Sequence, residues 1–133
     1  MSTDTQNPIV ELKGVEKNYM QGTVTVPALR GLDLTVGRGE FVAICGPSGS
    51  GKTTALNLIG ALDSATSGKV TVEGRDLGTM SRSALSRLRR DRIGFVFQAY
   101  NLVPVLTAYE NAEVVLALQG VSTSERKRMV MKL

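Results

Sequence analysis

Eight residues, numbered 46–53, constrain the fold of this chain more than any others. They read Gly-Pro-Ser-Gly-Ser-Gly-Lys-Thr, which matches the phosphate-binding pattern G-x-x-x-x-G-K-[ST] at every position. Residues 40–45 before them are apolar enough for a buried strand, and the apolar residues after them recur at helical spacing. The sequence therefore predicts a strand, a phosphate loop and a helix in that order, which together hold a nucleoside triphosphate.

Each residue type in the loop suits a phosphate ligand. Gly46, Gly49 and Gly51 allow positive φ and a close approach of the backbone N–H groups. The following helix adds unpaired N–H groups and the positive end of its dipole. The Lys52 ammonium would lie against the β- and γ-phosphates, and the Thr53 hydroxyl would complete a Mg²⁺ shell. The alternative is a glycine-rich turn with a solvated lysine, and the flanking strand and helix argue against it.

The bulk composition bounds the class of protein. A chain of 133 residues is one domain or less, and 42% hydrophobic residues with only 5% aromatics predict an aliphatic core. The only cysteine, Cys45, excludes a disulfide framework and is expected to be a small buried side chain. With no histidine, a His/Cys metal site is excluded. No apolar run is long enough to span a membrane, so we expect a cytoplasmic protein, at most peripheral to the membrane.

Patterning along the chain predicts the elements around the loop. Residues 1–8 resemble a loose leader, and alternation predicts strands over residues 9–19, 24–36 and 69–73. The wholly apolar residues 93–97 predict a strand in a sheet covered on both faces. Helices are predicted over residues 81–92, over 107–118 after a capping box from Thr107 to Glu110, and from a second capping box at Ser122 to the end of the chain.

Two clusters of basic residues stand out. Five arginines surround residues 82–92, at Arg82, Arg87, Arg89, Arg90 and Arg92, and a second cluster is Arg126-Lys127-Arg128. Solvated helix faces account for both most simply. Anionic lipid or an acidic partner is the alternative. Nucleic acid is not expected, because no stacking aromatics are interleaved with the basic residues.

The loop and its surroundings resemble the ATP-binding subunits of ABC transporters. The similar segments are residues 26–37, 39–54, 57–63, 67–68, 74–77, 92–98 and, in part, 101–111. The branch that it resembles includes the lipoprotein-release and macrolide-export ATPases. The implied fold is α/β: a P-loop NTPase core with an N-terminal antiparallel β subdomain over residues 9–100, and the start of a helical subdomain over residues 101–133.

The same resemblance implies roles for individual residues. Tyr19 would stack on adenine, a use of its π face that is physically sensible. Lys52 and Gln98 would be catalytic, and Gln98 would reach Mg²⁺ and the attacking water. Thr53 would contact Mg²⁺ and Thr54 the α-phosphate. The implied nucleotide contacts in the loop are Gly46, Pro47, Ser48, Gly49, Ser50, Gly51, Lys52, Thr53 and Thr54. The implied cofactors are ATP and Mg²⁺, and the implied partners are a polytopic membrane subunit and a second ATP-binding subunit.

One part of the family pattern is missing from these 133 residues. The signature loop, the acidic strand with the catalytic glutamate and the switch histidine lie later in such proteins. In the family, the phosphate loop of one subunit faces the signature loop of the other. We therefore expect a truncated, N-terminal part of an ATPase that binds ATP but hardly hydrolyses it alone.

Other classes of protein share the phosphate loop. DNA-repair and chromosome-organising ATPases send out a long coiled coil after the glutamine strand, whereas two short capped helices are predicted here. A small-molecule kinase would need an acceptor site and an arginine-bearing lid. A non-catalytic nucleotide-binding module is the remaining alternative.

Overall fold

The computed structural model describes residues 8–133, and the chain divides into two units, Met1–Leu85 and Ser86–Leu133. The predicted leader, residues 1–8, lies outside the described residues except for Pro8.

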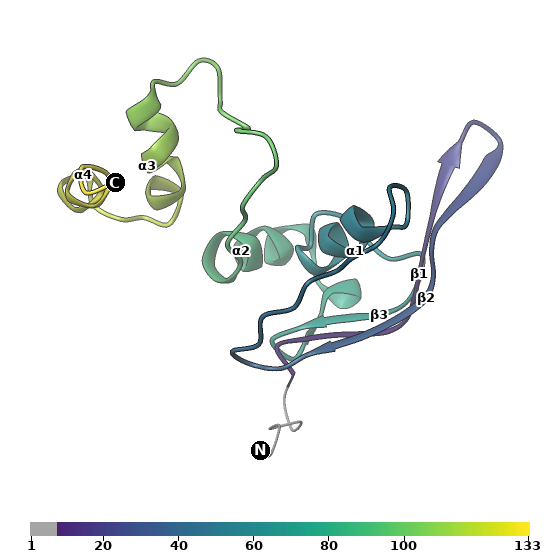
Figure 1. Cartoon of the computed structure of the whole chain (residues 1–133). Helices are drawn as coiled ribbons and strands as arrows, with labels where there is room; N and C mark the ends of the chain where they lie inside the picture. The colour runs from purple at the N-terminus through teal and green to yellow at the C-terminus, as the bar shows by residue number, and fades with distance from the viewer. Residues whose placement is uncertain (1–7) are drawn as a thin grey trace. The chain divides into compact units, whose positions relative to one another are not determined.

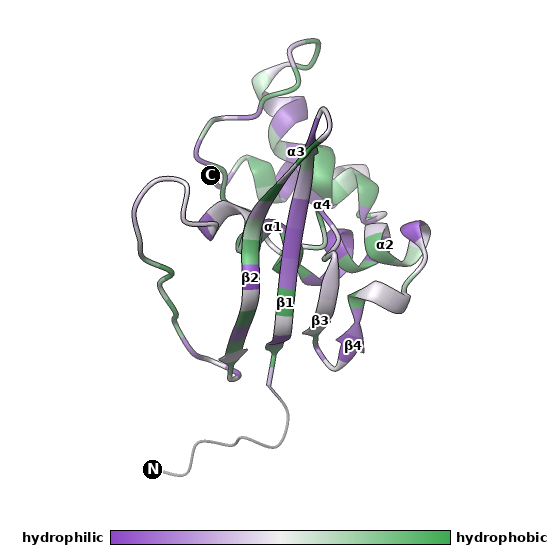
Figure 2. Ribbon diagram, turned by 90° about the vertical axis from the view of Figure 1, so that its right-hand side faces the viewer, coloured by the Kyte–Doolittle hydropathy of each residue, from purple (hydrophilic) through white to green (hydrophobic). Residues whose placement is uncertain are grey.

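The first unit is built on an antiparallel sheet. Strand β1 (Val10–Gln21) pairs with β2 (Val24–Val36) through a turn at Gly22, with β3 (Ser67–Val72) on its other edge and the short β4 (Arg75–Asp76) beyond. Figure 1 shows the long β1–β2 hairpin, and Figure 2 shows the four strands side by side in the order β2-β1-β3-β4. The antiparallel β subdomain expected from the sequence is confirmed.

Helix α1 (Lys52–Ile59) and the 3₁₀ turn η1 (Leu77–Thr79) complete the core of this unit. Aliphatic side chains supply the burial, as the low aromatic content predicts. The fully buried ones come from the strands and from α1: Leu12, Val15, Val70, Val72, Ala55 and Leu58 each keep 5% exposure or less. The start of α1 is thereby held against the sheet, which positions the phosphate loop.

Three further helices follow. Helix α2 spans Arg82–Arg92, α3 spans Ala108–Leu118 and α4 spans Thr123–Val130. The capping box at α3 is confirmed, since the Thr107 hydroxyl accepts from Glu110 N and the Glu110 carboxylate accepts from Thr107 N. The predicted box at Ser122 is wrong. Ser122 makes no capping hydrogen bond, Glu125 pairs with Arg128 instead, and α4 ends at Val130 rather than running to Leu133.

Two predicted strands do not form. Residues 40–45 and 93–97 have no regular secondary structure, and Phe41 and Val96 are fully exposed. An apolar segment becomes a strand only where a neighbouring strand accepts its N–H and C=O groups, and no strand of the described residues pairs with either segment. Cys45, predicted to be buried in the first of them, is exposed for the same reason. Phe95 and Phe97 stack on each other instead, with ring centroids 5.8 Å apart.

Candidate functional site

Backbone geometry in the glycine-rich loop agrees with what a phosphate ligand requires. Gly46, Gly49 and Gly51 all take positive φ, at 156°, 80° and 88°. Helix α1 begins immediately after Gly51, and no side chain caps it. Its first intrahelical bond runs from Ala55 N to Gly51 O, which leaves the N–H groups of the first turn for an external acceptor.

Strand β2 fixes the end of the loop. Ala28 forms a bulge in the pairing of β1 with β2. Lys17 pairs with Leu29 and the next residue, Asn18, pairs with Pro27, so Ala28 has no partner in the register. The Ala28 carbonyl approaches the loop so closely that only a residue without a Cβ fits at Gly51. A bulge in the antiparallel sheet and a glycine in the loop therefore hold the start of α1 in place together.

The hollow over the loop is lined by hydrogen-bond donors. Its volume is about 450 Å³, and its lining is Ala28, Ser48, Gly49, Gly51, Lys52, Thr53 and Thr54. Lys52 Nζ folds back over the loop and donates to Pro47 O at 2.6 Å and to Ser50 Oγ at 3.4 Å. The lining contains no carboxylate and the first turn of α1 contains no acidic residue. Ammonium, hydroxyl and amide groups without acid are the chemistry of an anion site.

The loop could hold a magnesium ion only with help from a ligand. Among residues 8–133 no cluster of three or more His, Cys, Asp or Glu side chains is placed to bind a metal. The Thr53 hydroxyl lines the hollow and suits Mg²⁺, which keeps most of its shell as water and phosphate oxygens. The residues present therefore fit Mg²⁺ carried by a nucleotide.

Tyr19 lies near the end of β1, where the residue is 39% exposed. Its hydroxyl donates to Asp63 Oδ2 at 2.9 Å, and the Lys17 ammonium lies 4.8 Å from its ring centroid. Lys17 in turn donates to Asp63 Oδ1 and to Ser64 O, each at 2.7 Å. Burial alone would raise the pKa of Asp63, but hydrogen bonds from Lys17, the Ser64 backbone and Tyr19 outweigh it and lower that pKa. Sequence reasoning missed this cluster, because no local pattern joins residues 46 positions apart.

Gln98 belongs to the second unit, where it lies in an exposed bend after residues 93–97. The structure therefore describes Gln98 and the phosphate loop in separate units. The metal and catalytic roles that the sequence assigned to Gln98 remain predictions.

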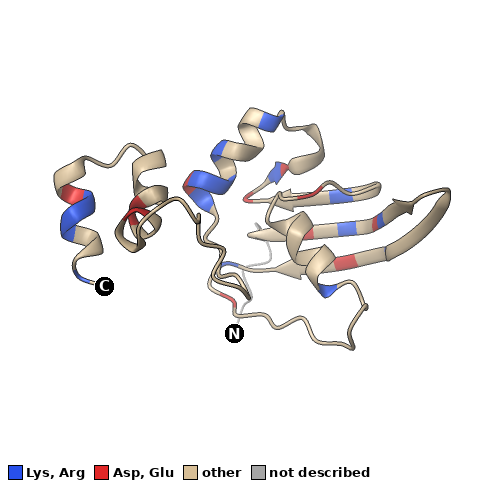
Figure 3. Ribbon diagram, turned by 90° about the horizontal axis from the view of Figure 1, so that it is seen from above, with Lys and Arg blue, Asp and Glu red and all other residues tan. Residues whose placement is uncertain are grey.

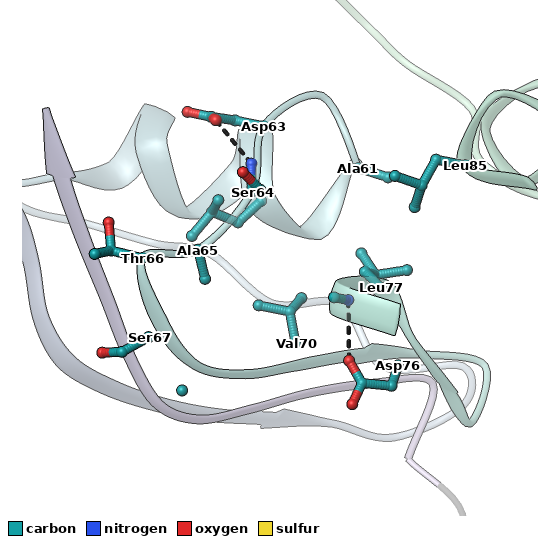
Figure 4. A pocket seen from close by; sticks show the side chains of 13 residues that line it. Ala61, Asp63, Ser64, Ala65, Thr66, Ser67, Val70, Asp76, Leu77 and Leu85 are labelled. Carbon is teal, nitrogen blue, oxygen red and sulfur yellow. Dashed lines mark hydrogen bonds between the residues drawn. The ribbon is translucent and has the colours of Figure 1, made fainter. Parts of the chain in front are cut away.

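A smaller cavity, of about 190 Å³, lies in the first unit beside the far end of α1 (Figure 4). Figure 4 shows apolar side chains such as Val70, Leu77 and Leu85 facing it, with Asp63 and Asp76 at its edge. Asp76 accepts from Gly78 N, and Asp63 from Ser64 N as well as from Lys17. Both carboxylates already have hydrogen-bond partners, and the other residues of the lining are uncharged.

The basic clusters are partly neutralised by local acidic residues. Arginines recur along α2 (Figure 3), where Arg90 pairs with Asp91 at 2.7 Å. In the second cluster Arg126 pairs with Glu113 at 2.8 Å and Arg128 pairs with Glu125. The Arg90–Asp91 and Arg128–Glu125 pairs are exposed, as on solvated helix faces. Arg126 differs, because its side chain keeps only 19% exposure and its pair with Glu113 joins α4 to α3. Within residues 8–133, none of the helices has the length and apolar character needed to cross a membrane.

A phosphate loop that opens a helix against a sheet defines a P-loop nucleotide-binding protein. More specifically, the chain belongs to the ABC transporter family, whose model matches residues 29–133. It is 50% identical over 121 residues to the lipoprotein-releasing system ATP-binding protein LolD of Anaeromyxobacter dehalogenans, with 90% of the chain and 51% of LolD covered. It is 45% identical over 126 residues to the macrolide export ATP-binding/permease protein MacB of Marinobacter nauticus, with 95% of the chain and 20% of MacB covered.

Solved structures agree with the assignment. The ATP-binding cassette MJ0796 of Methanocaldococcus jannaschii, solved as a dimer in a post-hydrolysis state bound to ADP and Pi, superposes with a TM-score of 0.86 at 44% identity. That match covers 92% of this chain and 54% of the cassette. The chain thus spans about half the length of LolD and of the cassette, and about a fifth of MacB. The branch that the sequence resembled, lipoprotein release and macrolide export, is confirmed.

Proposed function

We propose that this chain binds Mg-ATP at the Gly46–Thr53 loop as the ATP-binding part of an ABC transporter ATPase. The complete ATPase would couple ATP binding and hydrolysis to the export or release of a substrate at the membrane. The observation that carries the proposal is the hollow over the loop, which offers an ammonium, hydroxyls and helix N–H groups and contains no carboxylate. Such a lining favours a polyanion.

The proposed roles follow from where each group lies. Lys52 can exchange its contacts with Pro47 O and Ser50 Oγ for phosphate oxygens. Thr53 would hold Mg²⁺, which shields phosphate charge, and Thr54 would contact the α-phosphate. Tyr19 would stack on adenine. Gln98 would orient the attacking water.

Relatives support the proposed partners. The archaeal cassette was solved as a dimer, and we propose that a second ATP-binding subunit pairs with this one. A polytopic membrane subunit or domain is the second proposed partner, since MacB carries an ATP-binding part and a permease in its name. We propose a cytoplasmic position at the inner face of the membrane, with residues 9–100 as the nucleotide-binding core and residues 101–133 as the start of the helical subdomain.

Two observations favour a transporter over a DNA-repair or chromosome-type ATPase. Helices α3 and α4 are short, with 11 and 8 residues, whereas the DNA-associated class would continue into a long coiled coil. Two of the relatives reported above, LolD and MacB, are named for lipoprotein release and macrolide export. Because the 133 residues hold no signature loop or acidic strand, we expect this chain to bind ATP with little turnover.

Calorimetry with Mg-ATP tests the proposal. Wild-type chain should bind, and Lys52→Ala should abolish binding. The matched control is Lys127→Ala, which removes the same charge from α4 and should leave the affinity unchanged. Equal Mg-ATP affinities for wild type and Lys52→Ala would contradict the proposal.

A further inference from the structure

The Lys17–Asp63–Tyr19 cluster joins β1, which carries the proposed adenine-stacking Tyr19, to the segment that follows α1. Lys17 and Tyr19 lie on β1, and Asp63 lies four residues beyond the end of α1. The Lys17 side chain is only 11% exposed, and its ammonium is held by Asp63 Oδ1 and Ser64 O. A nearly buried ammonium must keep such partners, because unpaired charge is costly away from water. The 63–64 segment is therefore bound firmly to β1.

The cluster also determines how the Tyr19 ring lies. Its hydroxyl is anchored to Asp63 Oδ2, and the Lys17 ammonium lies near the ring at 4.8 Å from the centroid, a cation–π distance. A phenol held at its oxygen with a cation beside its ring has little freedom to rotate. Tyr19 as a whole residue nevertheless remains 39% exposed, so it has area left for an aromatic ligand.

The same cluster is tied to the phosphate loop through two routes. Along the chain, α1 runs from Gly51 and Lys52 at its start to Ile59, shortly before Asp63. Across the sheet, Tyr19 pairs with Val26, which lies two residues from the Ala28 bulge that contacts Gly51. Two residues of strand span about 7 Å. Tyr19 and the loop thus share one rigid frame.

We propose that Asp63 and Lys17 are positioning residues that hold the Tyr19 ring at the angle needed to stack on a purine base. They thereby set the preference of the site for an adenine nucleotide over a bare triphosphate. This inference rests on the proposed function, in which Tyr19 receives the base. Asp63 does not touch the nucleotide. It acts through the tyrosine hydroxyl and through the lysine beside the ring.

The test compares two probes, Mg-ATP and inorganic triphosphate, by calorimetry on the full chain. The double variant Lys17→Met/Asp63→Ala removes both charges together, so that no unpaired charge remains buried. Without the anchor the ring is free to rotate, and ATP affinity should fall about three- to tenfold while triphosphate affinity stays within about twofold. Lys17→Arg keeps a cation and its donors, and should restore most of the preference for ATP.

A control variant and a second measurement separate a positioning role from general structural damage. Thr66→Val removes the hydrogen bond from Asn18 N to Thr66 Oγ1 in the same loop without touching Tyr19, and should leave both affinities unchanged. The second readout is tyrosine emission in a Tyr100→Phe/Tyr109→Phe background, which is clear because the chain has three tyrosines and no tryptophan. ATP should quench Tyr19 emission there, and the Lys17→Met/Asp63→Ala change should weaken that quenching.

Distinct results overturn the inference and the proposed function. If Tyr19→Ala lowers ATP affinity relative to triphosphate but Lys17→Met/Asp63→Ala does not, the positioning role is wrong and the adenine site stands. A parallel loss of both affinities in the double variant also overturns it, since that result means structural damage. If Tyr19→Ala leaves the ratio of the two affinities unchanged, the adenine site itself is wrong and the inference falls with it.

Discussion

Gly51 lies so close to Ala28 that a Cβ atom on Gly51 would meet the Ala28 carbonyl oxygen at 2.6 Å. The same atom would lie 2.8 Å from the Leu29 side chain. Because the carbonyl belongs to the backbone of a paired strand, it cannot move aside cheaply. The residue immediately before α1 must therefore be glycine, because of a contact with a strand that lies more than twenty positions earlier in the chain.

The first prediction concerns this contact. Gly51→Ala should destabilise the chain by about 3 kcal/mol, through a methyl clash and an unfavourable φ together, and should abolish Mg-ATP binding. Gly49→Ala is the matched control, since Gly49 has a similar φ of 80° but open space around its Cβ position. It should cost only about 1 kcal/mol. Denaturant unfolding followed by circular dichroism measures both, and equal losses would contradict the clash.

The second prediction concerns the two hydroxyls that begin α1. Thr53→Val keeps the shape of the side chain but removes the proposed Mg²⁺ ligand. The ratio of the ATP affinity in Mg²⁺ to the ATP affinity in EDTA should therefore be about tenfold smaller than in wild type. Thr54→Val should leave that ratio unchanged. Titrations with ATP in Mg²⁺ and in EDTA give the comparison. A Thr53→Val chain that responds to Mg²⁺ as wild type does would remove Thr53 from the metal site.

The third prediction concerns the pH dependence of stability. Hydrogen bonds lower the pKa of Asp63 in the folded chain below its value in the unfolded chain. The carboxylate therefore stabilises the fold fully above the unfolded pKa of about 4 and loses this effect as the pH falls through the folded pKa. The free energy of unfolding should decline less steeply below about pH 4 in Asp63→Asn than in wild type. Parallel declines in the two chains would show that Asp63 contributes nothing.

The fourth prediction compares two helix starts. Thr107→Ala breaks the capping box of α3 and should destabilise that helix by about 1 kcal/mol. Ser122 begins α4 without a capping hydrogen bond. Ser122→Ala should therefore change the free energy of unfolding by no more than about 0.3 kcal/mol. Thermal unfolding of the two variants side by side tests the difference. Similar shifts in both would contradict the assignment of the caps.

Elements specified by neighbours in the sequence were predictable. The hairpin of β1 and β2 follows from alternation around Gly22, and the start of α3 follows from Thr107 and Glu110, which bond to each other across four residues. The loop conformation follows from three glycines whose positive φ values other residues rarely adopt. Each of these features could be read from its own segment, whereas the contact between Gly51 and the Ala28 carbonyl could not.

Features that depend on distant partners were not predictable in the same way. Residues 40–45 and 93–97 have strand composition, yet they lack strand neighbours among the described residues and remain irregular. The bond between Lys17 and Asp63 joins a strand to the segment after a helix, and neither residue stands out locally. The capping box predicted at Ser122 does not form, because the Glu125 carboxylate pairs with Arg128. The spacing of a motif does not reveal that a second partner competes for the same carboxylate.

The exposed apolar side chains of residues 40–45, such as Phe41, affect the solubility of the chain in salt solutions. Phenyl and aliphatic groups in contact with water are drawn together by excluded salts such as ammonium sulfate. The protein should therefore precipitate at low concentrations of sulfate, and purification should begin on an ion-exchange column at modest ionic strength.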